Sequence, residues 1–208
     1  MQPSQKKLCY LKASGANLIT TYRLLNNVKE YREAFADFKA MRKKFDGVKV
    51  WFAQKNETLL DKLKAKWQPV AVTFESDANS NQLPDISVWN SSCLILSERA
   101  RSILEPLVRS KGEFLALQDN YTLFNCLDCV GGDAISPEGS SFEMVTEASL
   151  HIPKTLVLLD DKIAGRTLFK PGFAHNSFLI FQDDFKNAVQ ENELGGIVFE
   201  SNLARIFL

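Results

Sequence analysis

The sequence predicts an α+β fold, in which about four helices pack against a mixed, mainly antiparallel sheet. Strand-like and helix-like segments are interspersed along the 208 residues without the repeating strand–helix–strand rhythm of a doubly wound parallel sheet. Two apolar segments, 113–117 and 121–130, flank a short turn and indicate a hairpin. With 45% hydrophobic and 24% charged residues, the chain can bury one substantial core or two small ones.

The first 75 residues are expected to form strands and two helices. One helix is predicted over 28–44, because apolar residues recur three and four apart and Asn27 with Glu30 resembles a capping box. A second helix begins after Asn56 and ends before Pro69. The apolar stripe of the first helix is Val28, Tyr31, Phe35, Phe38 and Met41. The expected strands are 8–12, 19–25, 48–53 and 70–74.

The middle of the chain carries the clearest local signals. Cys93 to Leu96 is a short buried-type strand, and Ser97 is a good N-cap for a helix that contains Pro106. Gly112 is the expected C′ residue of this helix, before the predicted hairpin.

Beyond the hairpin, residues 131–141 are expected to form a loop rich in glycine and serine, and 142–152 fits either a strand or a helix. A last helix is expected after Asp183 or Asp184. The remaining strands are predicted at 155–159, 167–170, 177–181 and 197–199.

The chain is neutral overall, but its charge is unevenly distributed. Residues 1–75 carry 15 Lys and Arg against 7 Asp and Glu, whereas 76–208 carry 10 against 18. We interpret residues 1–75 as a basic α/β part or subdomain, 76–83 as a linker or surface loop, and 84–208 as an α+β domain. Attraction between the two parts is the simpler interpretation of the charges, and nucleic-acid binding by the basic part is the alternative.

The sequence contains neither a signal peptide nor a run of about 18 apolar residues, so we expect a cytoplasmic protein with no membrane partner and reduced cysteines. Cys126 and Cys129 form a C-x-x-C motif at the end of a predicted strand. A redox-active pair would open a helix, and a structural zinc site would need two further ligands; the sequence predicts neither. The simpler interpretation is that these cysteines are small hydrophobic residues.

Catalytic and cofactor motifs are absent from the sequence. His151 and His175 each stand alone, and no phosphate loop or nucleophile elbow occurs. We therefore expect no enzyme, no cofactor and no metal site. A small hydrolase or modifying enzyme that uses separated carboxylates is the alternative; its candidate acids are Asp160, Asp161, Asp183, Asp184, Glu191 and Glu193.

An ordered set of short motifs between residues 84 and 200 resembles a known family. The set comprises Pro84-Asp85-Ile86, Leu94 to Ala100 with Leu104 and Leu107, Gly112 to Leu115, Tyr121 with Leu123 to Asn125, Leu168 to Lys170, Asp184-Phe185 and Leu194 to Phe199. It is similar to bacterial polymorphic-toxin immunity protein family eleven, formerly a domain of unknown function. Ala116 stands where that family has a proline, the chain end lacks its tryptophan, and residues 1–75 are not matched.

The resemblance implies an antitoxin: a cytosolic protein without catalytic residues that binds and blocks a cognate secreted toxin. Acids in a loop could meet a basic cleft on such a toxin. The expected partner-binding residues are therefore Asp128, Asp133 and Glu138. The sequence does not indicate the oligomeric state.

Overall fold

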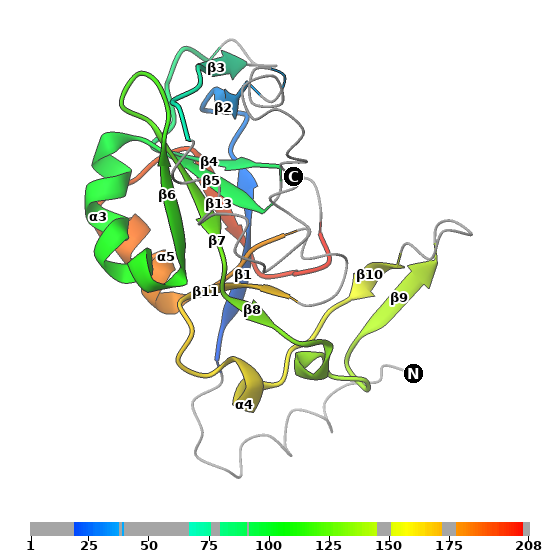
Figure 1. Ribbon diagram of the computed structural model, residues 1–208. Helices are drawn as coiled ribbons and strands as arrows, with labels where there is room; N and C mark the ends of the chain where they lie inside the picture. Colours follow the sequence, from blue (N-terminus) through cyan, green and yellow to red (C-terminus); the bar gives the residue numbers. More distant parts are fainter. Residues whose placement is uncertain are drawn as a thin grey trace.

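The computed structural model describes residues 19–37, 39, 67–75, 80–90, 92–144, 151–171 and 178–205. Two larger sheets and two small ones are arranged as shown in Figure 1. The predicted class is confirmed, because the structure mixes helices with mainly antiparallel sheets.

The four-stranded sheet is fully antiparallel, in the order β4-β5-β7-β6. All four residues of β5 are buried, because its alternate side chains enter two different apolar clusters. The strands are β4 (Ile86–Trp89), β5 (Cys93–Leu96), β6 (Gly112–Ala116) and β7 (Thr122–Cys126).

The five-stranded sheet has the order β13-β1-β12-β11-β8 and joins distant parts of the chain. β1 pairs antiparallel with both β12 and β13, while β8 pairs parallel with β11. The strands are β1 (Thr21–Asn26), β8 (Cys129–Val130), β11 (Leu168–Pro171), β12 (Ile180–Gln182) and β13 (Ile197–Glu200).

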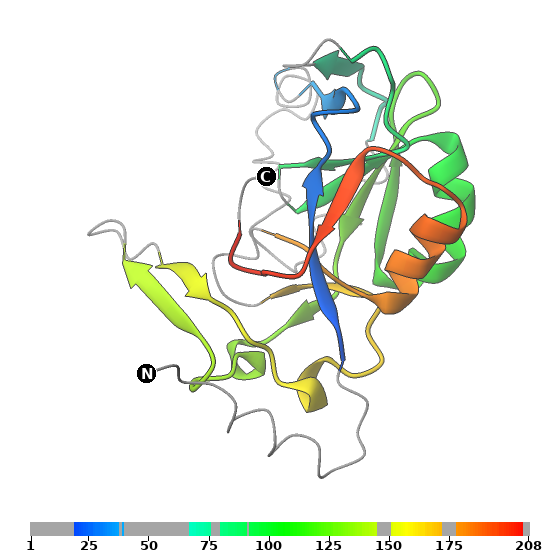
Figure 2. The same ribbon diagram turned by 180° about the vertical axis from the view of Figure 1, so that it is seen from behind.

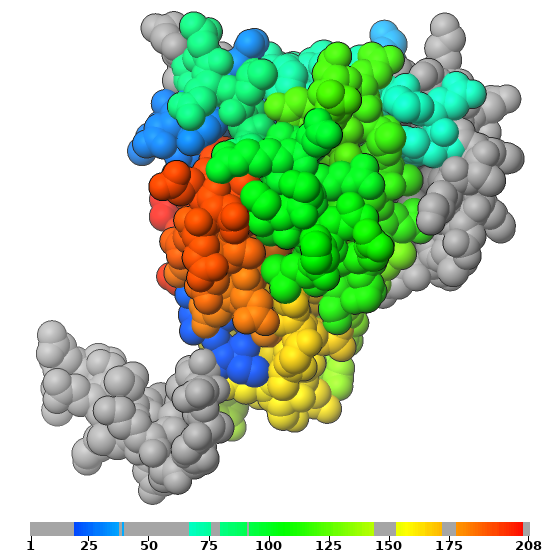
Figure 3. All heavy atoms as spheres, turned by 90° about the vertical axis from the view of Figure 1, so that its left-hand side faces the viewer, coloured from blue at the N-terminus to red at the C-terminus, as the bar shows by residue number. Residues whose placement is uncertain are grey.

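Two helices, α3 (Glu98–Val108) and α5 (Asp183–Glu191), lie side by side on one face of the molecule (Figure 3). Their apolar sides enter a cluster shared with both larger sheets, which contains Leu104, Phe124 and Phe185. This cluster holds the helices against the sheets.

Two smaller clusters extend the core. One packs β2 (Glu33–Ala36) and β3 (Val72–Glu75) against the four-stranded sheet, with Ile95 and Leu123 on the sheet side. The other lies under the loop after β8 and contains Ala134, Ile163 and Phe169. A short helix, α4 (Asp160–Ile163), supplies Ile163.

Several predicted elements are confirmed with small shifts in their ends: β5, β11, α5 and β13. The predicted hairpin forms from β6 and β7, but its second strand, expected over 121–130, ends at Cys126, and Cys129–Val130 form β8 in the five-stranded sheet. Ser97 caps α3 as expected, since its Oγ accepts a hydrogen bond from the Ala100 amide at 3.1 Å. The segment that fitted either a strand or a helix, 142–152, covers most of β9 (Ser141–Met144) and the start of β10 (His151–Thr155), which pair with each other.

The predicted helix over 28–44 is wrong for its first part. Asn27 forms a single turn, in which its carbonyl accepts from the Tyr31 amide at 3.0 Å and its side chain donates to Glu30 at 3.0 Å. The chain then enters β2, where Ala34 and Ala36 are buried. Hydrogen-bonded pairing with β3 makes these residues a strand, although their apolar side chains recur at the spacing of a helix. Apart from Lys39, the predicted range after residue 37 lies outside the described residues, as do strands 8–12 and 48–53 and most of the second helix.

Two further expectations are corrected. Gly112 is extended and opens β6 instead of ending α3; a 3₁₀ turn, Arg109–Lys111, ends the helical segment. A Cβ on Gly112 would meet the Phe124 ring, so close packing explains this glycine. The described residues contain three α-helices, only two of which span seven residues or more, instead of about four. The predicted division into domains stays a prediction.

Candidate functional site

The β9–β10 hairpin projects from the rest of the molecule, as Figures 1 and 2 show from opposite sides. Phe142 pairs with Pro153, and Ser141 pairs with Thr155. Phe142 is 37% exposed, which makes it one of three large apolar residues that the described chain leaves exposed; Val157, just after β10, is another at 47%. We take these two exposed side chains, on and beside the projecting hairpin, as the candidate contact surface.

The loop before β9 fixes the base of this hairpin. Ser136 donates its amide to the Val157 carbonyl at 2.9 Å, and the Val157 amide donates to Ser140 Oγ at 3.0 Å. An antiparallel bridge between Ile135 and Leu158 continues the pairing. These hydrogen bonds fix the loop that supports the hairpin. A partner that binds the hairpin therefore pays a smaller entropic cost for ordering this segment.

Two of the predicted contact residues lie on this loop. The Asp133 side chain is 70% exposed, and its carboxylate is 3.4 Å from Lys162 Nζ. Glu138 is exposed in the turn that leads to β9. Glu143 adds a third exposed carboxylate on β9, 3.4 Å from Lys154 Nζ. Because Phe142 and Glu143 are consecutive residues of β9, their side chains project from opposite faces of the hairpin. We call the exposed surface that contains Asp133, Glu138, Phe142 and Val157 the hairpin face.

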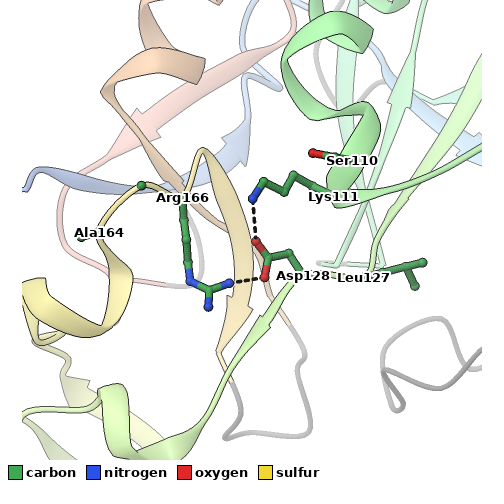
Figure 4. A pocket seen from close by; sticks show the side chains of 7 residues that line it. Ser110, Lys111, Leu127, Asp128, Ala164 and Arg166 are labelled. Atoms are coloured by element: carbon green, nitrogen blue, oxygen red, sulfur yellow. Dashed lines mark hydrogen bonds and ion pairs between the residues drawn. The ribbon is translucent and has the colours of Figure 1, made fainter.

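The third predicted contact residue, Asp128, has different surroundings. Its side chain is only 15% exposed, because it lies between Arg166, with which it forms a hydrogen-bonded ion pair, and Lys111, whose Nζ is 3.4 Å away (Figure 4). A partner protein could reach the Asp128 carboxylate only by displacing these cations. We therefore do not count Asp128 among the residues of the hairpin face.

The apolar half of the hairpin face was not found from the sequence. Segment 142–152 has a pattern that fits a strand or a helix, and such a pattern does not say which side chains face solvent. The sequence indicated only that residues 131–141, which are rich in glycine and serine, form a loop at the surface.

The cysteines have the surroundings of core residues. Burial raises the pKa of the Cys93 thiol to about 11 and that of the Cys126 thiol to about 12. Both thiols are therefore protonated at neutral pH, the form that is a poor nucleophile and a poor metal ligand. Cys129 is partly buried, and Cys9 lies outside the described residues.

Two of the remaining candidate acids accept hydrogen bonds from β1 or the residues just before it. Asp183 accepts a hydrogen bond from the Tyr22 hydroxyl at 3.0 Å, and Asp160 accepts one from the Ile19 amide at 3.4 Å. His175 lies outside the described residues, and only the backbone of His151 is described. Within the described part of the chain, no group of three or more His, Cys, Asp or Glu residues could hold a metal ion.

Residues from four of the short motifs between 84 and 200 meet around the Asp85 carboxylate. Oδ1 accepts from Ser97 Oγ at 2.9 Å, while Oδ2 accepts from Arg99 Nη1 at 3.2 Å and from the Gly195 amide at 3.1 Å. The Tyr121 hydroxyl donates to the Pro84 carbonyl beside it at 3.3 Å. Motifs separated by about a hundred residues in the sequence thus form one polar centre, which ties the start of α3 to the entry of β13.

A comparison of the chain with models of known protein families finds no match, and a search of curated proteins finds no similar sequence. Among the described residues, none of the helices has the length and apolar character needed to cross a membrane.

Proposed function

We propose that this chain is an immunity protein, which binds a cognate bacterial toxin in the cytosol and neutralises it by direct protein–protein contact. The observation that carries the proposal is the polar centre at Asp85. Ser97 and Arg99 come from one motif of the resemblance to immunity family eleven, Tyr121 from a second and Gly195 from a third, yet all four contact Asp85 or its neighbour Pro84. Such convergence is expected when the motifs are the scaffold of a shared fold.

The hairpin face is the proposed contact surface. Phe142 and Val157 provide apolar area, and the exposed carboxylates of Asp133 and Glu138 add negative charge, part of which the Lys162 ammonium beside Asp133 offsets. A central aromatic anchor with a charged rim is the usual composition of a tight interface. The acidic rim favours a toxin whose active-site cleft is basic, because complementary charge speeds association.

Protection requires that almost no toxin stays free. A dissociation constant of about 1 nM corresponds to about −12 kcal/mol. Such affinities are reached by interfaces that bury roughly 800 Å² on each partner when a few anchors are well packed. The hairpin with its supporting loop would form the centre of such an interface, and neighbouring surface would complete it.

Co-expression tests the proposal. The chain is produced in bacteria together with the toxin encoded by the gene immediately upstream of its own, and survival and co-purification are measured. We expect cells to survive only when the chain is present, and the two proteins to co-purify. Death of cells that contain both proteins, with no complex on purification, would refute the proposed function.

A further inference from the structure

A cavity of about 440 Å³ lies at the junction of three connecting segments, well separated in sequence (Figure 4). Ser110 and Lys111 come from the 3₁₀ turn after α3, Leu127 and Asp128 from the link between β7 and β8, and residues 164–166 from the link between α4 and β11. Its volume lies within the range of small-molecule sites.

The lining carries a net positive charge. Lys111 and Arg166 both point toward the single carboxylate of Asp128, so two cations share one anion. The Asp128–Lys111 contact is long, at 3.4 Å, and the Asp128 Oδ2 atom has no hydrogen-bond partner. Lys111 is therefore held near Asp128 by charge alone, and its ammonium donors stay available to a ligand.

Hydrogen-bond donors gather at the mouth of this cavity. Arg166 carries five N–H donors and uses one of them on Asp128, while its side chain is 29% exposed. The Lys111 side chain is 26% exposed, and Ser110 adds a hydroxyl group at an exposed position. A guanidinium, an ammonium and a hydroxyl group around one space form a donor set suited to phosphate oxygens.

Backbone hydrogen bonds keep these donors in place. The amides of Leu127 and Asp128 both donate to the Lys111 carbonyl, at 2.7 and 3.1 Å, and the Lys170 amide donates to the Asp128 carbonyl at 2.8 Å. Gly165, with φ of 72°, lets the chain turn tightly before Arg166 and leaves open space where a side chain would project. The cations are thus positioned before any ligand arrives, which favours binding.

We propose that this cavity binds a phosphate group, with Lys111, Arg166 and Ser110 as its donors and Asp128 as the residue that positions the two cations. The group could be inorganic phosphate or the phosphate of a small polar monoester. The site is separate from the hairpin face, so the proposal does not rest on toxin binding.

The experiment titrates the full chain with inorganic phosphate, ribose 5-phosphate and ribose, and follows amide chemical shifts by NMR at constant ionic strength set with potassium chloride. Shifts centred on residues 110–111, 127–128 and 164–166 are expected with phosphate-containing probes and not with ribose. Binding of both phosphate probes with equal affinity indicates a site for the group alone, and tighter binding of ribose 5-phosphate indicates a monoester site. No saturable shift by either probe at 10 mM, on the order of ten times the dissociation constant of a weak millimolar site, would overturn the proposal.

Variants of the two cations complete the test. Arg166→Gln and Lys111→Gln should each weaken phosphate binding at least tenfold, whereas Lys162→Gln, on α4 and outside the cavity lining, should leave it unchanged. The NMR spectrum of each variant without ligand shows whether it is folded. A folded Arg166→Gln protein that binds phosphate as the unmodified chain does would contradict the assignment, as would an equal loss in Lys162→Gln.

Discussion

The Asp85 carboxylate accepts a hydrogen bond from the backbone amide of Gly195, 110 residues away in the sequence, at 3.1 Å. The backbone reinforces this contact, because the amides of Asp85 and Ile86 both donate to the Gly195 carbonyl at 3.0 Å. The segment before β4 and the segment before β13 are thus joined by three hydrogen bonds. This junction joins the two ends of segment 84–200.

Replacing Asp85 should destabilise the protein strongly. Asp85→Ala leaves the Gly195 amide and the Ser97 hydroxyl without their acceptor, and should lower the free energy of unfolding by about 3 kcal/mol. Asp85→Asn should cost less, because the amide oxygen can replace Oδ2 as the acceptor for Arg99 and Gly195 while the NH2 group donates to Ser97 Oγ; the variant loses the negative charge that pairs with Arg99. Urea denaturation measures both changes.

Asp161→Ala is the matched control, because Asp161 is exposed in the first turn of α4. Its loss should change the free energy of unfolding by no more than about 0.5 kcal/mol. An Asp85→Ala protein as stable as this control would show that the polar centre contributes nothing to the fold.

Gly196→Ala should be among the most damaging glycine substitutions in the described chain. Gly196 has φ of 110°, which side chains rarely adopt, and a Cβ there would meet the Ile86 carbonyl and Pro84. We expect a loss of about 3 kcal/mol in thermal or urea unfolding. Gly132→Ala, where a Cβ meets nothing within 4 Å, should cost less than about 1 kcal/mol. If both variants lose the same free energy of unfolding, the backbone angle and close packing of Gly196 do not explain its effect.

The buried thiols should make stability fall at alkaline pH. The pKa values of Cys93 and Cys126, about 11 and about 12 in the folded protein, lie above the value of about 8.5 for an unfolded cysteine. The unfolded state therefore loses these protons first. Their contribution is complete below about pH 8.5 and decreases above it, by up to about 1.4 kcal/mol per pH unit for each thiol, until the folded protein also ionises.

Urea unfolding between pH 8 and pH 10, under reducing conditions, tests this dependence. Cys93→Ala removes one of the two groups, so its free energy of unfolding should fall less steeply with pH than that of the unmodified chain. An identical slope for the two proteins would mean that the Cys93 thiol ionises as readily in the folded state as in the unfolded state.

Phe142 should be an anchor of toxin binding. Phe142→Ser removes the exposed aromatic ring of the hairpin face and should weaken toxin binding by about 2 kcal/mol, roughly 30-fold. Leu83→Ser is the matched control: Leu83 is 50% exposed but lies outside the hairpin face, so its change should leave the affinity as it was. If Leu83→Ser weakens binding and Phe142→Ser does not, the contact surface lies elsewhere.

Elements with strong local signals could be predicted from the sequence. The Ser97 cap fixes the start of α3, and Asp119 and Asn120, both with left-handed backbones at φ of 57° and 60°, form the tight turn between β6 and β7. The predicted helix at 28–44 shows the limit. Asn27 and Glu30 do make the expected local contact, but pairing with β3 makes residues 33–36 a strand.

Of the hairpin face, the sequence predicted only the acidic residues. The exposure of Asp133 and Glu138 is expected from loop composition, whereas the ion pairs of Asp128 depend on Arg166, 38 residues further along the chain. The Asp85 centre is also non-local, because it needs Gly195 to be brought next to β4. Contacts between distant segments are set by the packing of the sheets, which the pattern of one sequence does not specify.

Toxin neutralisation is tested most directly by isothermal titration calorimetry. The purified chain is titrated into the purified product of the gene immediately upstream, which the proposal expects to be the toxin. A stoichiometric complex with a dissociation constant of about 10 nM or tighter is the expected result. A dissociation constant weaker than about 1 μM, or no binding heat at all, would contradict the proposal that this protein is an antitoxin.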